Sequence, residues 1–273
     1  MKLHSTADGW FAHDGDQLAH LPAFDMDQWL AMDDPCTELH GIFAASNKLH
    51  VEEIRDSLPM RSQEVWAAGV TYLRSRAARM EESQFGANAY DRVYDAPRPE
   101  LFFKATARRC VGHGQPLRLR DDSKWIVPEP ELALLIAANG RIVGYTIGDD
   151  LSCRDIEGEN LLYLPQAKVW DGCCALGPCI LVDDGHLDIR RSSIHMEIRR
   201  SDEVVFTGST DFAKIKRSFD ELVAYLFRNQ SFPVGVFLLT GTGIVPPEGF
   251  SLQRGDEIHM EVTEIGVLSN RVR

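Results

Sequence analysis

The segment around residues 128–150 constrains the fold most strongly, because it combines a buried strand, a tight turn and a returning strand. Residues 132–137 are continuously apolar, as in a strand that is covered on both faces. Asn139-Gly140 follows, and this dipeptide is the strongest short signal for a two-residue hairpin turn. Residues 142–147 then supply the returning strand. The sequence therefore predicts an antiparallel hairpin inside the protein core.

The rest of the chain indicates a mainly β protein with few helices. Short apolar or alternating runs predict further strands at residues 65–70, 101–104, 194–198, 204–206, 236–239, 258–262 and 267–272. Ser218 and Glu221 form a capping box before an apolar stripe, which predicts a helix over residues 218–228. Residues 72–83 lack Gly and Pro and predict a second helix. Because strands and helices do not alternate regularly, we expect an α+β fold, mainly β, rather than a Rossmann or TIM architecture.

The composition argues against nucleic-acid and membrane partners. The 29 Lys and Arg residues and 41 Asp and Glu residues give a formal net charge of -12, and no basic patch stands out that could release counterions from phosphates. No apolar run approaches the roughly 20 residues that span a bilayer, and residues 1–10 lack the apolar core of a signal peptide. The six cysteines form no C-x-x-C pair, which is typical of reduced thiols. We therefore expect a cytoplasmic protein.

Acidic residues gather at the entrance of the predicted hairpin. In an extended chain, Glu129 and Glu131 lie on the same face, about 6.6 Å apart, so both carboxylates can reach one ion. The returning strand brings Asp149 and Asp150 back beside them. Such a cluster is costly in a low-dielectric environment, and a hard dication would remove the cost. An all-oxygen ligand set favours Mg²⁺, with Mn²⁺ or Ca²⁺ as alternatives.

Several motifs resemble those of one known family. Residues 144–155 read G-Y-T-I-G-D-D-L-S-C-R-D and resemble the G-Y-T-x-x-N-D-x-S-A-R-D signature of the fumarylacetoacetate hydrolase family. Further resemblances follow the family's order: E-P-E at 129–131, A-K at 167–168, L-G-P at 176–178, L-T-G-T-G at 239–243 and G-V-L-S-N at 266–270. The resemblance implies a mixed β-sandwich roll, usually a homodimer or homotetramer, with one magnesium or manganese ion. Residues 63–273 would be its catalytic domain, and residues 1–62 a small N-terminal region that ends near Ser57-Leu58-Pro59.

The resemblance also implies roles for individual residues. The metal ligands would be Glu129, Glu131 and Asp150. The active-site lysine would be Lys168, and the substrate pocket would contain Ser152, Arg154 and Thr242.

One family motif is absent. Many hydrolase and decarboxylase members carry G-x-N-Y-x-x-H-x-x-E, whose His-Glu pair activates a water molecule, whereas Ser75 and Ala78 stand at these positions here. Without this base, a hydrolase would lose about two to four orders of magnitude in rate. Residues 72–83, 155–168 and 240–247 are instead similar to a narrower branch, the 2-keto-3-deoxy-pentonate (arabinonate or xylonate) dehydratases. This resemblance implies conversion of a 2-keto-3-deoxy-pentonate to 2,5-dioxopentanoate and water.

Such a dehydration requires groups that move protons and hold the substrate. Lys168 is the first candidate, because a partly desolvated ammonium near a dication should have a lowered pKa. Glu157 and Glu159 are candidates for a second acid–base group. Arg74 and Arg76, on the helix expected over residues 72–83, are candidates to neutralise the charge of the substrate.

Two other functions stay open at this point. The first is an acylpyruvate hydrolase or oxaloacetate decarboxylase of the same family, which would need a base on another loop. The second is a non-catalytic relative that binds a 2-oxo acid. Retention of the three acidic ligands and Lys168 argues against the second.

Overall fold

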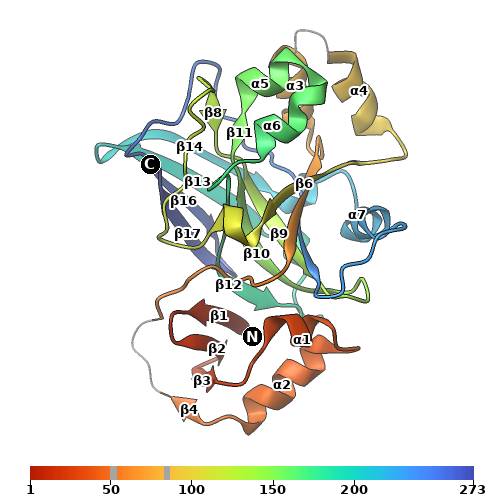
Figure 1. Cartoon of the computed structure of the whole chain (residues 1–273), viewed down its shortest axis with the longest axis vertical. Coiled ribbons are helices and arrows are strands. Elements are labelled where there is room, and N and C mark those ends of the chain that lie inside the picture. Colours follow the sequence, from red (N-terminus) through yellow and green to blue (C-terminus); the bar gives the residue numbers. More distant parts are fainter. Residues whose placement is uncertain (50–53, 83–86) are drawn as a thin grey trace.

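Two β-sheets that share a hydrophobic core form the body of the protein (Figure 1). This computed structural model describes residues 1–49, 54–82 and 87–273, without the side chains of Arg76, Arg79 and residues 81–82 and 87–90. Within these ranges no helix is long and apolar enough to cross a membrane.

The large sheet runs through the whole molecule. In sheet order its strands are β4 (Lys48–Leu49), β3 (Gln17–Leu21), β2 (Gly9–Asp14), β1 (Lys2–Thr6), β12 (Cys174–Val182), β10 (Ile142–Asp150), β9 (Pro130–Ile136), β15 (Val236–Leu239), β5 (Glu64–Gly69) and β6 (Glu100–Thr106), with β7 (Cys110–Val111) paired to β12. The predicted hairpin is confirmed as the antiparallel pair of β9 and β10. Gly140 lies in its turn with a φ of +83°, a conformation that glycine adopts without strain.

The smaller sheet contains β14 (Glu203–Asp211), β13 (Ser193–Arg200), β16 (Glu257–Val262) and β17 (Gly266–Arg271), in that order. A two-stranded ladder joins β11 (Ser152–Cys153) to β8 (Ile126–Val127). The α-helices are α1 (Met26–Leu30), α2 (Pro35–Ala45), α3 (Leu73–Glu82), α4 (Ala87–Asp95), α5 (Arg154–Glu159), α6 (Leu164–Lys168) and α7 (Phe219–Leu226). Short 3-10 helices are η1 (Ala107–Arg109), η2 (Leu161–Tyr163), η3 (Ile189–Arg191) and η4 (Phe212–Lys214).

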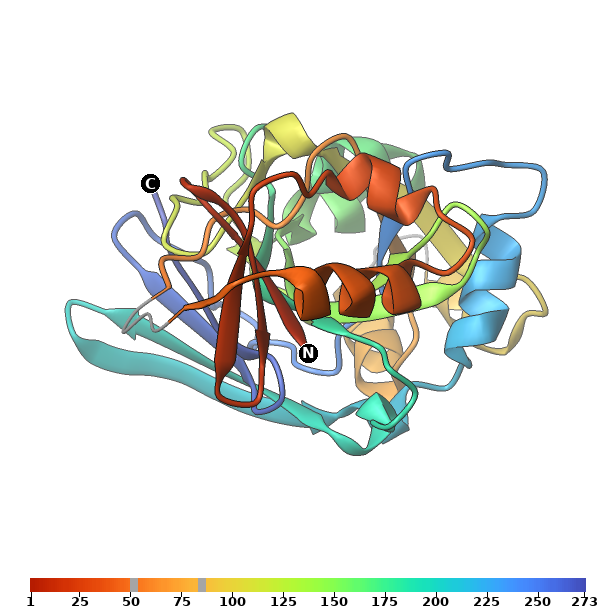
Figure 2. The same cartoon turned by 90° about the horizontal axis from the view of Figure 1, so that it is seen from below.

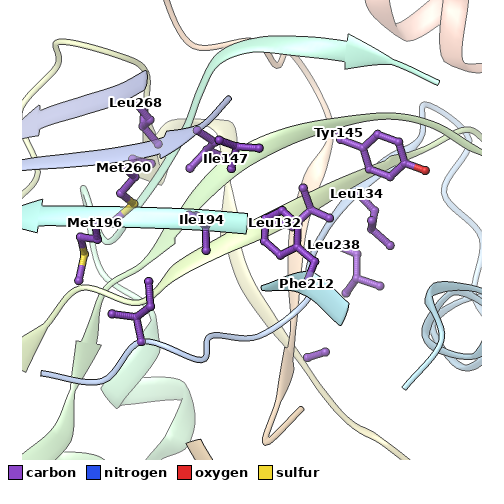
Figure 3. Close-up of a cluster of buried hydrophobic side chains, with 14 of the residues drawn as sticks. Leu132, Leu134, Tyr145, Ile147, Ile194, Met196, Phe212, Leu238, Met260 and Leu268 are labelled. Carbon is purple, nitrogen blue, oxygen red and sulfur yellow. The ribbon is translucent and has the colours of Figure 1, made fainter. Parts of the chain in front are cut away.

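Both faces of β9 are buried, because alternate residues of this strand enter different cores. Leu132 and Leu134 belong to the core that also contains Met196 and Met260 of the smaller sheet (Figure 3). Residues 133 and 135 point the other way, into a second core that includes Trp29 and other residues of α1, α2 and the first strands. The apolar run of this strand therefore reflects burial on both sides, as its composition predicts.

The N-terminal strands continue the large sheet, since β1 pairs with β12. Together with α1 and α2 they form one end of the molecule (Figures 1 and 2). Helices α3, α5 and α6 lie at the opposite end, near the open ends of β9 and β10. Helix α7 begins as predicted, because the Ser218 side chain accepts the N–H of Glu221 at 3.1 Å. The expected α+β fold, mainly β, is confirmed.

Candidate metal centre and substrate pocket

The register of the β9–β10 hairpin brings three carboxylates to one face. Gly148 lies opposite Glu131, and the N–H of Asp150 donates to the carbonyl of Glu129 at 3.0 Å. Because directly opposed residues share a face, Glu129, Glu131 and Asp150 project to the same side of the sheet. Each offers an oxygen within 4.8 Å of the others, and all three side chains are buried. The expected convergence at the hairpin entrance is therefore present in the structure.

Asp149 turns away from this group. It lies opposite Pro130 on the neighbouring strand, so its side chain points to the other face. There its Oδ1 accepts the N–H of Glu129 at 3.1 Å. Of the two adjacent aspartates, the geometry therefore selects Asp150 as the third acid.

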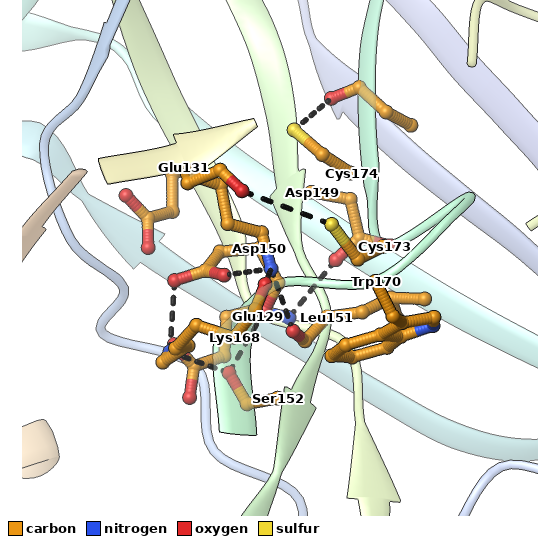
Figure 4. A network of polar contacts seen from close by, with 12 residues as sticks. Glu129, Glu131, Asp149, Asp150, Leu151, Ser152, Lys168, Trp170, Cys173 and Cys174 are labelled. Atoms are coloured by element: carbon orange, nitrogen blue, oxygen red, sulfur yellow. Dashed lines mark hydrogen bonds and ion pairs between the residues drawn. The ribbon is translucent and has the colours of Figure 1, made fainter. Parts of the chain in front are cut away.

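Basic side chains contact two of the three acids (Figure 4). The Lys168 Nζ lies 2.9 Å from Glu129 Oε2 and 2.8 Å from Asp150 Oδ2, and it also contacts the Ser152 hydroxyl at 2.5 Å. Arg154 donates from Nη1 to Glu129 Oε1 at 3.0 Å. Lys168 is the last residue of α6, and Arg154 is the first of α5. The two helices therefore place one cation on each side of Glu129.

Glu131 has a different environment. In the described part of the chain no basic side chain forms an ion pair with it, and its Oε2 accepts the main-chain N–H of Gly241. Gly241 has a φ of +91°, and a Cβ there would lie 2.0 Å from the Thr71 hydroxyl, so this donor requires glycine. Burial, and then the charges of Asp150 and Glu129, raise the pKa of Glu131 well above its ordinary value. A buried carboxylate that is repelled by two neighbouring acids and has no cationic partner among the described residues fits a binding site for a hard dication.

This raised pKa predicts that cation binding releases protons. At pH values where an ordinary glutamate is ionised, Glu131 retains a proton, and a dication that uses its carboxylate displaces that proton. We expect the affinity for Mg²⁺ to increase with pH until Glu131 is ionised in the free protein. Calorimetric titration in two buffers with different ionisation enthalpies, at the same pH, measures the release. Heats that do not depend on the buffer would contradict this prediction.

The pocket brings together most of the residues expected from the sequence. Its walls include the three acids, Arg154, Glu157, Lys168 and Thr242. Thr242 follows β15, where its hydroxyl donates to the carbonyl of Ile244 at 3.2 Å. Ser152 does not line the pocket itself, but its hydroxyl contacts the Lys168 ammonium at 2.5 Å.

Two other candidates do not join this group, and a third lies outside the described side chains. Glu159 and Arg74 are exposed and do not line the pocket. Glu159 lies two positions after the buried Glu157 on α5, and residues two apart on a helix point in nearly opposite directions. The side chain of Arg76 lies outside the described part of the structure.

Ser75 lines the pocket at the position where many family members carry histidine. Its hydroxyl donates to the carbonyl of Tyr72 at 2.9 Å and accepts the N–H of the same residue at 3.3 Å, at the start of α3. Ala78 is buried and has no polar side chain. These two positions therefore provide no base for a hydrolytic water.

Strand β6 contributes two pocket residues that the sequence did not single out. Glu100 and Phe102 line the pocket, and Lys104 follows at the same spacing of two. The Phe102 ring lies 5.3 Å from the Lys168 Nζ. Glu100, Phe102 and Lys104 are two residues apart along a strand, so they lie on one face of it. This spacing is the sequence signal that could have identified β6 as a side of the pocket.

Comparisons with known proteins agree with this geometry. The family described as fumarylacetoacetate (FAA) hydrolase C-terminal matches residues 64–273. The chain is 48% identical over 216 residues to the probable 2-keto-3-deoxyxylonate dehydratase of Haloferax volcanii, covering 79% of this chain and 74% of that protein. It is 43% identical over 226 residues to the 2-dehydro-3-deoxy-D-arabinonate dehydratase of Saccharolobus solfataricus, covering 82% and 76%.

A solved structure gives the same result for the fold. A 2-keto-3-deoxy-D-arabinonate dehydratase complexed with magnesium and 2,5-dioxopentanoate has a TM-score of 0.85 and 35% identity, and the comparison covers 100% of this chain and 97% of that one. This similarity confirms the mixed β-sandwich roll. The chain belongs to the fumarylacetoacetate hydrolase family.

Proposed function

We propose that this protein is a magnesium-dependent dehydratase that converts a 2-keto-3-deoxy-pentonate to 2,5-dioxopentanoate and water. The observation that carries the proposal is a buried Glu-Glu-Asp group beside Lys168, in a pocket without the His-Glu pair of the hydrolases. The names of the relatives that are 48% and 43% identical support the substrate class. The similar structure with magnesium and 2,5-dioxopentanoate supports both the metal and the product.

Glu129, Glu131 and Asp150 would hold the cation, because their oxygens are close together and buried. When bound, the cation would polarise the 2-oxo group and stabilise the negative charge that develops as a C3 proton leaves. Arg154 keeps Glu129 oriented through its 3.0 Å contact. Thr242 and Ser152 supply hydroxyl groups beside this centre, for the substrate and for Lys168 respectively.

The reaction needs several proton transfers. A base removes a proton from C3 and the C4 hydroxyl leaves as water, which forms a C3–C4 double bond. A proton then leaves C5 and a proton is added at C3, which gives a C4–C5 enol. Protonation at C4, with loss of the proton on the enol oxygen, converts the enol to the C5 aldehyde. Lys168 is the proposed shuttle, and Glu157 is a second acid–base candidate on the pocket wall. Glu100 on β6 adds a further carboxyl group to the pocket wall, and we propose it as another acid–base candidate. General acid–base groups of this kind typically contribute about 10²- to 10⁴-fold in rate.

The alternative within the family is cleavage of a carbon–carbon bond, as in acylpyruvate hydrolysis or oxaloacetate decarboxylation. That chemistry needs an activated water or release of CO₂. Ser75 and Ala78 do not supply the water-activating base, because the Ser75 hydroxyl is bonded to the main chain of Tyr72. The residues of the pocket therefore favour dehydration.

Product analysis tests the proposal. We expect the purified protein with Mg²⁺ to convert a 2-keto-3-deoxy-pentonate to 2,5-dioxopentanoate, identified by mass spectrometry, and to lose this activity with a chelator. Pyruvate as the product would support carbon–carbon cleavage instead. Saturable binding without any product would support a non-catalytic 2-oxo acid binder. Oxaloacetate and an acylpyruvate serve as the comparison substrates.

We further propose the organisation and location of the protein. Residues 63–273 would form the catalytic domain and residues 1–62 a small N-terminal region, in which helices α1 and α2 pack in the core on one side of the large sheet. A homodimer or homotetramer would be consistent with the exposed Val204 and Val205 on β14, at the edge of the smaller sheet. Light scattering tests this assembly. All six cysteines are unpaired thiols, which supports a cytoplasmic location.

A further inference from the structure

Lys104 is a fully buried lysine to which the proposed reaction assigns no task. It lies on β6, where Glu100 and Phe102 on the same side of the strand line the pocket. Lys104 itself does not line the pocket, and its side chain has 0% relative exposure. A buried ammonium is costly unless all of its charge is compensated by close partners. The identity of these partners therefore indicates what Lys104 does.

The Lys104 ammonium has three partners. It forms an ion pair with Asp150 Oδ1 at 2.6 Å, and it donates to the carbonyl of Leu151 at 2.8 Å and to the carbonyl of Lys168 at 2.5 Å. The ring of Trp170 lies 5.1 Å from the Nζ and covers the site. The carbonyls of Leu151 and Lys168 accept two N–H groups of the ammonium, and its positive charge lies against the Asp150 carboxylate.

These contacts orient the third acid of the metal centre. Asp150 directs Oδ1 to Lys104 and Oδ2 to Lys168 in the pocket. A carboxylate that is held by one oxygen has little freedom to rotate, so Lys104 determines which oxygen of Asp150 faces the pocket. Groups that hold a metal ligand in this way commonly change metal affinity by about 10- to 100-fold when they are removed.

The same ammonium also holds the backbone of the proposed proton shuttle. Lys168 ends α6, a helix of 5 residues, and a helix this short has little stability of its own. The bond from Lys104 fixes the carbonyl of Lys168, while the Lys168 side chain contacts Asp150 and Glu129. One buried cation therefore connects the metal centre to the main chain that carries the shuttle.

We propose that Lys104 is a positioning residue for the dehydratase reaction: it holds Asp150 with Oδ2 toward the pocket and fixes the backbone of Lys168 beside it. This inference rests on the proposed function for its kinetic consequences. Its consequence for cation binding concerns the resting protein and can be measured without substrate.

The test is a Lys104→Met variant, which keeps the length of the side chain and removes the ammonium. The matched control is Lys2→Met, which removes one lysine bond to a carbonyl, that of Ile265 at 3.1 Å, away from the pocket. We expect calorimetry to show that Lys104→Met weakens Mg²⁺ binding by about 10- to 100-fold, and that Lys2→Met leaves it unchanged. Loss of a positive charge near the site would by itself strengthen cation binding. A weaker affinity for Mg²⁺ therefore shows that Lys104 positions Asp150. An unchanged or stronger affinity for Mg²⁺ in folded Lys104→Met overturns the proposal.

Kinetics at saturating Mg²⁺ supply a second readout. We expect Lys104→Met to lower kcat by at least 10-fold, with KM for the 2-oxo acid within about threefold of the parent, because the substrate contacts remain and the shuttle loses its alignment. In a double-mutant cycle with Lys168→Ala, the two losses in kcat should not add, since Lys104 acts through Lys168. Full additivity would contradict that coupling.

Two further comparisons keep the result interpretable. If Lys104→Met does not fold, Lys104→Gln replaces it, because the amide N–H groups keep hydrogen-bond donors at this position and carry no charge. With Lys104→Gln, an unchanged Mg²⁺ affinity and kcat would overturn the proposal, and losses in both would support it. If the parent protein binds Mg²⁺ but does not dehydrate the pentonate, the proposed function fails, and the affinity comparison still decides the role of Lys104 at the metal centre.

Discussion

A Glu131→Gln variant is expected to lose at least about three orders of magnitude of Mg²⁺-dependent turnover while its fold is retained. Removal of a single group that stabilises transition-state charge commonly costs about 10²- to 10³-fold, and loss of a metal ligand also removes the cation. Glutamine keeps the shape of the side chain, and its carbonyl oxygen can still accept the N–H of Gly241. Only the negative charge required by the dication is lost.

The stability of this variant is also informative. Because burial and neighbouring acids raise the pKa of Glu131, ionisation of this residue destabilises the free protein as pH rises through its folded pKa. Glutamine removes that ionisation, so we expect thermal unfolding at neutral pH, without metal, to occur at the same or a higher temperature than in the parent. Glu159→Gln, the same substitution on an exposed residue, is the matched control. Near-normal turnover in folded Glu131→Gln would reject Glu131 as a ligand.

Replacing Lys168 with alanine is expected to give the second largest effect, a fall in kcat of about 10²- to 10⁴-fold. The Nζ of Lys168 contacts Glu129 and Asp150 and lies at the pocket wall, where a proton on the substrate can reach it. Mg²⁺ and the 2-oxo acid should still bind, because the three acids remain. Rapid-quench measurement of product, together with binding detected by calorimetry, separates turnover from affinity.

The control for this variant is Lys214→Ala, which removes an exposed lysine that pairs with Asp211. If Lys168→Ala binds substrate normally but reacts slowly, the lysine acts in proton transfer. If substrate binding itself fails while Mg²⁺ still binds, Lys168 is a charge clamp, and the shuttle must be sought among Glu157 and Glu100.

The parts of the fold that depend on local sequence were predictable. The hairpin of β9 and β10 follows from an apolar run, an Asn-Gly turn and a second run, all within about twenty residues of chain. Its register then determines that Glu129, Glu131 and Asp150 share a face, and this is why the metal group could be anticipated. Helix α7 was predictable for a similar reason, since its cap and apolar stripe are both local.

Other strands were missed because their signals are weak or contradictory. Strand β12 contains Gly177 and Pro178, which normally interrupt a strand, and the structure accommodates them with an irregular register between Tyr145 and Ile147 on β10. Strand β1 pairs with β12, whose sequence lies more than 160 residues further along the chain. No local pattern specifies a pairing of that kind.

The composition of the pocket was predictable only in part. Motif positions led to Lys168, Arg154 and Thr242, which all line the pocket. The sequence alone could not show whether Glu157 or Glu159 faces the pocket. That depends on where α5 begins, because a shift of its start rotates each side chain around the helix axis. The sequence suggested Lys104 only as a minor acid–base candidate. Its contacts with Asp150 and Lys168 could not be predicted, because these residues lie in two distant segments of the chain.

The central claim is that three buried carboxylates at one end of a hairpin hold the catalytic cation. The most direct measurement is anomalous diffraction from crystals soaked in Mn²⁺, a substitute for Mg²⁺ that can be located without ambiguity. We predict one strong peak with Glu129, Glu131 and Asp150 each at a bonding distance, about 2.0–2.2 Å for a cation of this size. A peak at another position, or none between these three side chains at saturating Mn²⁺, would contradict the claim.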